Sequence, residues 1–537
     1  MLPRLFGNMN DHCVRDGSLA QNGCGKFADI TDDVLHSLVQ LGATHVWYTG
    51  VIRHATQTDY SRYGIPRNNA HVVKGKAGSP YAIVDYYDID PDLAVDVRLR
   101  QDEFDALISR THQAGLKVIL DFVPNHVARE YHSIAKPIGV SDLGEGDDTN
   151  QFFSPNNNFY YLTGQAFAPT MGCGDYHEAP ACATGNDCFT ASPGKYDWYE
   201  TVKLNYGIDP WNGSHHYYPI PDTWHKMLHI LLYWASRGID GLRCDMAHMV
   251  PVEFWHWAIS QVKQQYPRMV FIAEIYDVAL YDSYINYGGF DYLYDKVTLY
   301  DTLVNVLTNN YSAGELTQCW QAVNPWRDHM LHFMENHDEV RVASAHFCDD
   351  PVIALPALVV SATIDCGPMM IYNGQELGEK ADEAEGYRGA DGRTTIFDYW
   401  SMGTVRQWLA KGKLNGRHRL RDYYKKVLRL CNQEPAISDG EMFDLMYVNP
   451  NLHRQYAYLR HHDGQLLLIV ANFADHVATV DVTVPSHAFE HLHLAAGEYR
   501  GNELLHGDKS QFHLTPDQPL TLTIRPNDAV VWKFFVK

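Results

Sequence analysis

The chain has 537 residues, of which 45 % are hydrophobic and 20 % charged, a composition typical of a soluble globular protein of two or three domains. Its 65 acidic residues outnumber its 43 Lys and Arg, and the resulting formal charge of -22 would repel nucleic acid phosphates and anionic lipid head groups. The composition argues against a disordered protein, and no apolar run is long enough to span a bilayer. We therefore expect a neutral or cationic partner.

Helices and short β-rich runs alternate along the first 430 residues. Thr31 can cap a helix that Gly42 ends, and a strand is predicted directly after it, at residues 44–48. A second helix is predicted from Trp224 to Ser236. Such alternation is typical of a parallel sheet, either open and doubly wound or closed into an eight-stranded barrel. Further strands are predicted at residues 116–121, 239–245, 269–273, 331–334 and 368–372.

The positions of four carboxylates favour the barrel. Asp121, Asp245, Glu274 and Asp338 each lie at or just past the C-terminal end of a predicted strand. Barrel enzymes assemble their active sites from this face of the sheet. No G-x-G-x-x-G motif follows an early strand, so a dinucleotide-binding sheet has no support. We predict an α/β protein with a (β/α)8 TIM barrel.

Two stretches depart from the barrel pattern. Residues 127–205 are rich in Asn, Gly, Pro, Tyr and Ser and are too long for a simple loop, so we interpret them as a subdomain inserted after strand 3. From residue 435 onward the pattern has period two, which predicts a C-terminal antiparallel β-sandwich. The predicted domains are the barrel at 1–126 and 206–434, the inserted subdomain at 127–205 and the β-sandwich domain at 435–537.

The ten cysteines form no C-x-x-C pair, so they indicate no zinc or redox site. Cys173, Cys182 and Cys188 cluster within the inserted subdomain. Both a local disulfide and free thiols are compatible with that spacing.

Four segments, in this order, resemble the four conserved segments of the α-amylase family of glycoside hydrolases, family 13. Two flanking stretches agree, at residues 81–87 and 372–376, and the resemblance covers nearly the whole chain, including the inserted subdomain and the C-terminal β domain. The segments are Asp121-Phe-Val-Pro-Asn-His126, Gly241-Leu-Arg-Cys-Asp245, Phe271-Ile-Ala-Glu274 and Phe333-Met-Glu-Asn-His-Asp338.

The resemblance implies a catalytic role for three carboxylates. Asp245 would be the nucleophile, Glu274 the general acid/base, and Asp338 would hold sugar hydroxyls at the cleavage subsite. Cleavage of a glycosidic bond passes through an oxocarbenium-like state, so it needs one carboxylate below the anomeric carbon and one carboxylic acid beside the leaving oxygen. A carboxyl separation of about 5 to 5.5 Å would give double displacement with retention of configuration.

Five further residues are implied to bind substrate. Arg243 lies two residues before Asp245, on the same side of the strand, and can keep that carboxylate ionised and oriented. His126 and His337 would donate hydrogen bonds to the sugar, and Tyr81 would provide a stacking platform. His248 occupies a position where many α-amylases have Lys, with Met249 in place of the following His, so contacts beyond the cleaved bond are expected to differ. Within the family, Asp121 mainly braces the site, and Arg341 is expected to bridge a neighbouring carboxylate.

Asn125 matches a residue that often ligates a structural Ca²⁺ between the barrel and the inserted subdomain. Calcium needs several oxygen ligands, and the sequence does not assign the others. The resemblance therefore implies a possible structural calcium at Asn125, and a hydrolase of this type needs no organic cofactor.

Three functions remain open from the sequence. The first is an α-amylase-like hydrolase of α-1,4-linked glucans or maltooligosaccharides. The second is a transglycosylase or disaccharide-converting enzyme on the same machinery, because a sugar hydroxyl can intercept the covalent intermediate. The third is a noncatalytic carbohydrate-binding relative, against which the intact set Asp245, Glu274 and Asp338 counts.

The beginning of the chain departs from the family pattern. Residues 2–6 provide only a short first strand, and the first residues lack the charged start and apolar stretch of a signal peptide. We expect either a frayed first strand or residues missing before Met1. A missing export signal would place the protein in the periplasm or outside the cell, and otherwise it would be cytoplasmic.

Overall fold

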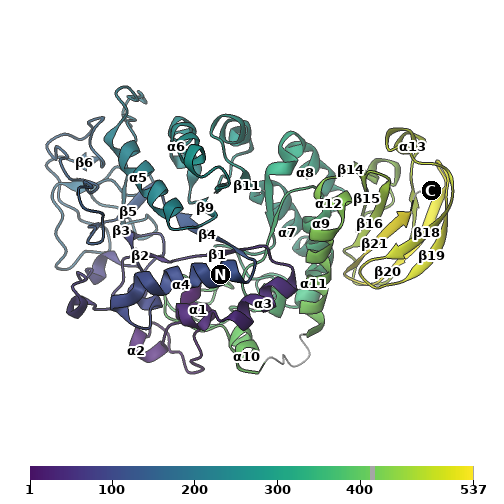
Figure 1. Ribbon diagram of the computed structural model, residues 1–537, viewed down its shortest axis with the longest axis horizontal. Helices are drawn as coiled ribbons and strands as arrows, with labels where there is room; N and C mark the ends of the chain where they lie inside the picture. Colours follow the sequence, from purple (N-terminus) through teal and green to yellow (C-terminus); the bar gives the residue numbers. More distant parts are fainter. Residues whose placement is uncertain (412–417, 536–537) are drawn as a thin grey trace.

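The computed structural model describes residues 1–411 and 418–535. At its centre lies a curled sheet in which the described residues contribute seven strands, all paired in parallel (Figure 1). The predicted barrel class is therefore confirmed. In spatial order the strands are β1 (His45–Tyr48), β4 (Lys117–Phe122), β9 (Gly241–Cys244), β10 (Val270–Ala273), β11 (Tyr292–Tyr294), β12 (Met330–Phe333) and β13 (Met369–Met370).

Helices pack around the outside of this sheet (Figure 1). The first long one begins where predicted, because the Thr31 side chain accepts the Val34 N–H at 3.4 Å, and it ends at Gly42, whose φ of 113° suits glycine. The long helices are α3 (Asp32–Leu41), α4 (Arg100–Gln113), α5 (Asp222–Ser236), α6 (Val252–Gln265), α7 (Asp301–Thr308), α8 (Glu315–Val323), α9 (Leu355–Thr363), α10 (Gly403–Lys411) and α11 (His418–Gln433). Short ones are α1 (Pro3–Phe6), α2 (Leu19–Asn22), α12 (Pro435–Ser438) and α13 (Ser486–His491).

The prediction of a first strand at residues 2–6 is wrong, because Pro3 begins the short helix α1 there. Met1 alone pairs like a strand residue: its amino group donates to the Trp47 carbonyl at 2.7 Å and its carbonyl accepts the Thr49 N–H at 2.9 Å. The edge strands β1 and β13 are consequently not paired with each other. A space of about 560 Å³ is lined by residues of both edges, among them Val46 and Met370.

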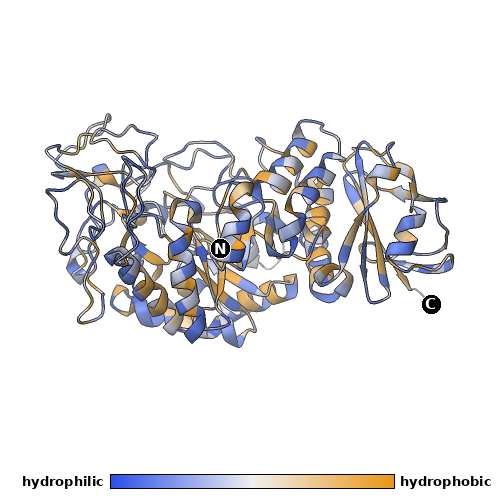
Figure 2. Ribbon diagram, turned by 90° about the horizontal axis from the view of Figure 1, so that it is seen from above, coloured by the Kyte–Doolittle hydropathy of each residue, from blue (hydrophilic) through white to orange (hydrophobic). Residues whose placement is uncertain are grey.

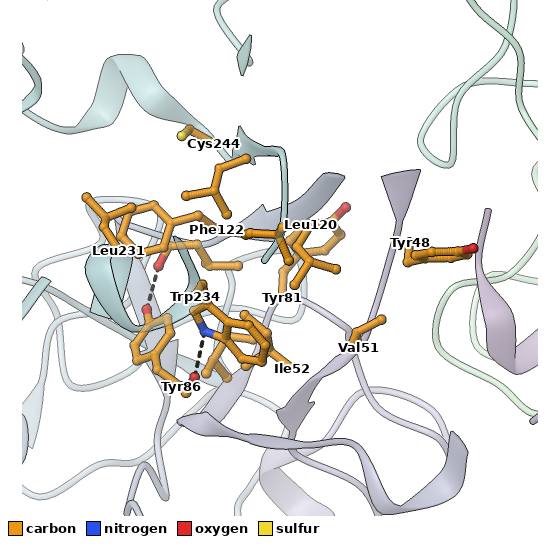
Figure 3. Close-up of a cluster of buried hydrophobic side chains, with 14 of the residues drawn as sticks. Tyr48, Val51, Ile52, Tyr81, Tyr86, Leu120, Phe122, Leu231, Trp234 and Cys244 are labelled. Atoms are coloured by element: carbon orange, nitrogen blue, oxygen red, sulfur yellow. Dashed lines mark hydrogen bonds between the residues drawn. The ribbon is translucent and has the colours of Figure 1, made fainter. Parts of the chain in front are cut away.

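A large aromatic core supports the strand ends on one side of the barrel. Here β3 (Ile83–Ile89), which pairs antiparallel with β2 (Ile52–His54), packs against α4 and α5. Figure 3 shows Trp234 of α5 reaching the backbone of β3, where its indole N–H donates to the Tyr86 carbonyl at 2.9 Å. Phe122 and Tyr81 lie in the same buried cluster. This packing fixes the end of β4 and the base of the Tyr81 loop.

The inserted stretch is mostly loop, and Figure 2 shows it as largely hydrophilic chain at one end of the molecule. Two small antiparallel pairs organise it: β5 (His126–Ala128) with β8 (Thr201–Lys203), and β6 (Tyr161–Leu162) with β7 (Ala181–Cys182). All ten cysteines lie in the described ranges, and each of them is a free thiol, including Cys173, Cys182 and Cys188.

The predicted C-terminal β-sandwich is confirmed at the opposite end of the molecule (Figure 1). The pair β17 (Ala478–Thr483) and β20 (Pro519–Ile524) packs on the larger sheet through a shared apolar core. Across residues 1–411 and 418–535, no helix is both long and apolar enough to cross a membrane. The larger sheet runs β14 (Glu441–Asp444), β15 (Gln455–His462), β16 (Gln465–Asn472), β21 (Asp528–Phe535), β18 (Gly497–Glu503) and β19 (Lys509–Leu514).

Candidate active site

Arg243 is the centre of a buried cluster of charges at the C-terminal end of β9. Its side chain is fully buried, and the extended strand directs it to the same side as Asp245, two residues later. One terminal nitrogen, Nη1, donates to Asp245 Oδ1 at 2.8 Å, and the other, Nη2, lies 2.8 Å from Glu274 Oε2. The Nε–H donates to the Tyr294 hydroxyl at 3.1 Å. One guanidinium therefore contacts both carboxylates.

Glu274, which follows β10, receives further donors. The Met246 N–H donates to its Oε2 at 2.8 Å, and the Tyr276 hydroxyl donates to its Oε1. Both Glu274 and Asp245 are buried. Burial, which is the larger cause, and the nearby charge of Glu274 raise the pKa of Asp245 well above its usual range, while Arg243 opposes the shift. The carboxyl pair therefore binds one proton more tightly than two isolated carboxyls would.

Asp338 lies beside this pair, on the loop after β12. Its Oδ2 is 3.0 Å from His337 Nε2, and the same nitrogen is 2.6 Å from the Tyr81 hydroxyl. The Tyr81 and His337 rings stack with centroids 5.3 Å apart. Burial acts in the opposite direction, but His337 and Arg243 lower the pKa of Asp338, so this carboxylate is ionised. With a side chain 37 % exposed, Asp338 faces the open side of the cluster.

Asp121 braces the other residues, as expected. The Trp47 indole donates to its Oδ2 at 2.8 Å and the Tyr81 hydroxyl to its Oδ1 at 3.3 Å, while Arg243 Nη1 lies 3.4 Å from Oδ1. These contacts join β1, the Tyr81 loop, β4 and β9 through one buried carboxylate. Arg341 also behaves as expected, because its Nη1 donates to Glu335 at 2.9 Å.

His126 and His248 lie at two edges of the cluster. His126 is buried, hydrogen-bonds to the Tyr81 backbone and faces Trp198 with ring centroids 5.1 Å apart. Burial, followed by the charge of Lys203, lowers its pKa to about 3, so the ring is neutral. His248 is half-buried, and its Nδ1 lies 3.5 Å from the Glu274 carbonyl. Both of these histidines therefore reach the cluster, as His337 does.

Asn125 does not fit the calcium site that the sequence suggested. Its side-chain oxygen accepts a hydrogen bond from the Lys203 ammonium at 2.5 Å, and its Nδ2 donates to the Gly185 carbonyl at 2.7 Å. A lysine ammonium next to the one predicted ligand repels a divalent cation and occupies the oxygen that would bind it. The Asn125 oxygen therefore serves as a hydrogen-bond acceptor for an ammonium group.

Sequence analysis missed three residues that the structure places in the cluster: Trp47, Tyr276 and Tyr294. Tyr276 could have been found, because it lies two residues after Glu274 and therefore shares its side of an extended segment. Tyr294 could not, since its three-residue strand carries no periodic pattern of its own.

Two family models match this chain, and both describe domains of alpha amylases. Residues 2–402 match the family model of the alpha amylase catalytic domain, and residues 447–535 match that of the alpha amylase C-terminal all-beta domain. The trehalose-6-phosphate hydrolase of Bacillus subtilis is 22 % identical across 84 % of this chain and 88 % of that protein.

Two more matches add a transferase and a solved structure. An alpha-1,4-glucan:maltose-1-phosphate maltosyltransferase of Cereibacter sphaeroides is 24 % identical over 37 % of this chain, which covers only 33 % of that protein. The crystal structure of the alpha-amylase of Geobacillus thermoleovorans complexed with acarbose superposes with a TM-score of 0.66 at 18 % identity, covering 100 % of this chain and 97 % of that one. At such identity the likeness shows the fold alone.

Proposed function

The chain belongs to the alpha-amylase family of glycoside hydrolases, and from this premise we propose that it is a retaining hydrolase of α-1,4-glucosidic bonds in starch-like glucans or maltooligosaccharides. One observation carries the proposal: the Arg243 guanidinium contacts Asp245 and Glu274 at 2.8 Å each. A guanidinium with nitrogens 2.8 Å from each carboxylate keeps the two close together, and a short carboxyl separation is what double displacement requires.

In the first step, an Asp245 oxygen attacks the anomeric carbon while the bond from that carbon to the leaving oxygen breaks. Glu274 gives its proton to the leaving oxygen, so the departing sugar leaves as a neutral alcohol. The product of this step is a glycosyl ester of Asp245 and an ionised Glu274. Arg243 supports the step because it holds Asp245 in place and stabilises its ionised form.

In the second step, Glu274 takes a proton from water, and the water oxygen attacks the anomeric carbon. The ester bond to Asp245 breaks, and its carboxylate and the protonated Glu274 are restored. Two inversions at one carbon retain the configuration. Asp338, ionised and partly exposed, would accept hydrogen bonds from sugar hydroxyls, and Tyr81 would stack on the ring face.

The net charge of the chain supports a neutral substrate. The net charge of -22 repels an anionic, phosphorylated sugar as it approaches the protein, whereas a neutral glucan meets no such repulsion. By the family resemblance, His248 and Met249 correspond to positions that contact leaving-group sugars, so chain-length preference would depend on them and on loops of residues 127–205.

A transglycosylase is the second candidate, and a specific finding favours it. A maltosyltransferase matches more than a third of the chain, so the same barrel serves transfer in a relative. A sugar hydroxyl in place of water in the second step gives transfer without any change in the catalytic residues.

The deciding experiment is a time course of products from purified protein and one linear maltooligosaccharide, resolved by chain length. Shorter products alone support the hydrolase, and products longer than the starting sugar would replace it with the transglycosylase. An unchanged substrate, with sucrose, trehalose and pullulan also intact, would refute both and favour the noncatalytic relative. The Asp245→Asn variant is the control, because it keeps the shape of the site and removes the nucleophile.

A further inference from the structure

Lys203 lies at the junction between the barrel and the inserted subdomain. It is the last residue of β8 and pairs in register with His126 of β5, so its side chain leaves the subdomain next to a predicted sugar-binding residue. The side chain is 9 % exposed. A buried ammonium is costly unless its three N–H donors all find acceptors.

Three acceptors from three different segments surround this ammonium. Asn125 Oδ1, on the loop after β4, lies at 2.5 Å, and Asp187 Oδ1, in the inserted subdomain, at 2.7 Å. The Met249 carbonyl, just past the nucleophile strand β9, lies at 3.4 Å. The neighbouring Gly185 carbonyl accepts from Asn125 Nδ2, which fixes the amide with its oxygen toward Lys203.

We infer that the Lys203 ammonium is the built-in cation of this junction, so that the fold and the active site need no calcium ion. The ammonium neutralises the Asp187 carboxylate and binds the amide and carbonyl oxygens. A bound calcium ion would otherwise neutralise and coordinate the same oxygens. Because two of the three acceptors, Asn125 and Met249, are sequence neighbours of His126 and His248, we also assign Lys203 as a positioning residue. It holds the two edges of the sugar site at a fixed distance from the carboxyl pair.

The same molecule offers a matched control. Lys226, at the other side of the inserted subdomain, is also 9 % exposed and also binds one Asn and one Asp, with 2.9 Å to Asn158 Oδ1 and 2.7 Å to Asp222 Oδ2. It does not belong to the site cluster described above. Loss of either ammonium leaves a half-exposed carboxylate without its cation, but only loss of Lys203 releases the loops that carry His126 and His248.

The first test is thermal unfolding of the full chain with excess chelator and with added CaCl₂, together with metal analysis of the purified protein. The inference predicts the same Tm in both conditions and substoichiometric calcium. A Tm that falls with chelator and returns with calcium, or one calcium bound per chain, would overturn it. This test does not use the proposed activity.

The second test rests on the proposed hydrolase function and compares Lys203→Met with Lys226→Met. Both are expected to lower Tm by a few degrees, because each removes the hydrogen bonds of a buried ammonium whose partner carboxylate is half exposed. Only Lys203→Met should lower kcat/KM for a maltooligosaccharide, by roughly tenfold or more, because a small shift of positioning groups has a large effect on rate. Unchanged kcat/KM in folded Lys203→Met protein would refute the positioning role. If wild-type protein shows no activity, the proposed function fails and the calcium result stands independently.

Discussion

Replacement of Arg243 by Met tests the charge cluster most severely. The side chain is fully buried and forms ion pairs with Asp245 and Glu274 at 2.8 Å and a longer one with Asp121 at 3.4 Å. Met fills a similar volume but leaves the carboxylates without a counter-charge. Breaking a buried pair by removing one partner costs about 3 to 5 kcal/mol. For a domain the size of residues 2–402, that loss lowers Tm on the order of 5 °C.

The loss depends on pH in a direction that the structure specifies. Because the pKa of Asp245 is raised in the folded protein, the folded state binds this proton more tightly than the unfolded state does. Its stabilising contribution is therefore present at low pH and is lost as pH rises from the ordinary carboxyl pKa through the raised one. Without Arg243 this loss becomes larger. The Tm deficit of Arg243→Met should thus be greatest at alkaline pH and shrink as the solution is acidified.

The assay is calorimetric unfolding of wild type, Arg243→Met and the double variant Arg243→Met/Asp245→Asn between acidic and alkaline pH. The double variant removes one unpaired carboxylate and should recover part of the lost Tm. Arg341→Met/Asp245→Asn is the control: Arg341 pairs with a different buried carboxylate, Glu335 at 2.9 Å, so Asp245→Asn should recover none of the Tm that Arg341→Met loses. A Tm deficit that is equal at all pH values, with no recovery in the double variant, would refute the reasoning.

Three further predictions use other residues. His332 lies between Asp365 at 2.7 Å and Asp295 at 3.3 Å, and although burial opposes the shift, these carboxylates raise its pKa to about 10. The stability that this group contributes is complete below the ordinary histidine pKa of about 6.5 and is lost as pH rises through 10. Wild type should therefore lose more Tm over that range than His332→Gln, and parallel curves of Tm against pH would contradict this. Glu274→Gln should lose most activity on substrates with poor leaving groups and far less on activated aryl glycosides, and an equal loss on both would argue against the acid role. Tyr81→Phe should keep the stacking face and lower kcat/KM less than Tyr81→Ala does, and identical losses would show that the ring contributes nothing beyond its hydroxyl.

Much of the barrel could be predicted because its signals are local. The helix from Thr31 and the strands ending near Asp121, Asp245 and Glu274 follow from caps, apolar spacing and glycine stops that lie within a few residues of one another. Since parallel strands end at one face, the carboxylates after three separate strands had to meet. The Arg243 contact with Asp245 follows from the same strand alternation.

The first strand was predicted wrongly for a physical reason. Residues 2–6 are apolar enough for a strand, but Pro3 has no N–H to pair and suits the first position of a helix. The strand carrying Tyr294 was missed because only three residues are extended before a π-helical turn begins at Lys296.

Long-range partners were beyond sequence reasoning. Lys203 and Asn125 are 78 positions apart in a stretch that is mostly loop, and their contact depends on how the inserted subdomain folds back onto the barrel. The sequence alone therefore indicated Asn125 as a calcium ligand, whereas in the structure Asn125 accepts a hydrogen bond from Lys203. Trp47 was missed for a milder reason, since aromatic residues near strand ends are common and only the folded site distinguishes this one.

The measurement that tests the central claim most directly is identification of the covalent intermediate. Glu274→Gln protein, given an α-glucosyl fluoride that needs no acid to leave, should accumulate the glycosyl-enzyme, because the second step lacks its base. After proteolysis, mass spectrometry should find one added hexosyl group on the peptide that contains Asp245, and Asp245→Asn/Glu274→Gln protein should carry none. A hexosyl group on another carboxylate, or fluoride release with no labelled peptide, would contradict the account of Asp245 as nucleophile in a retaining site.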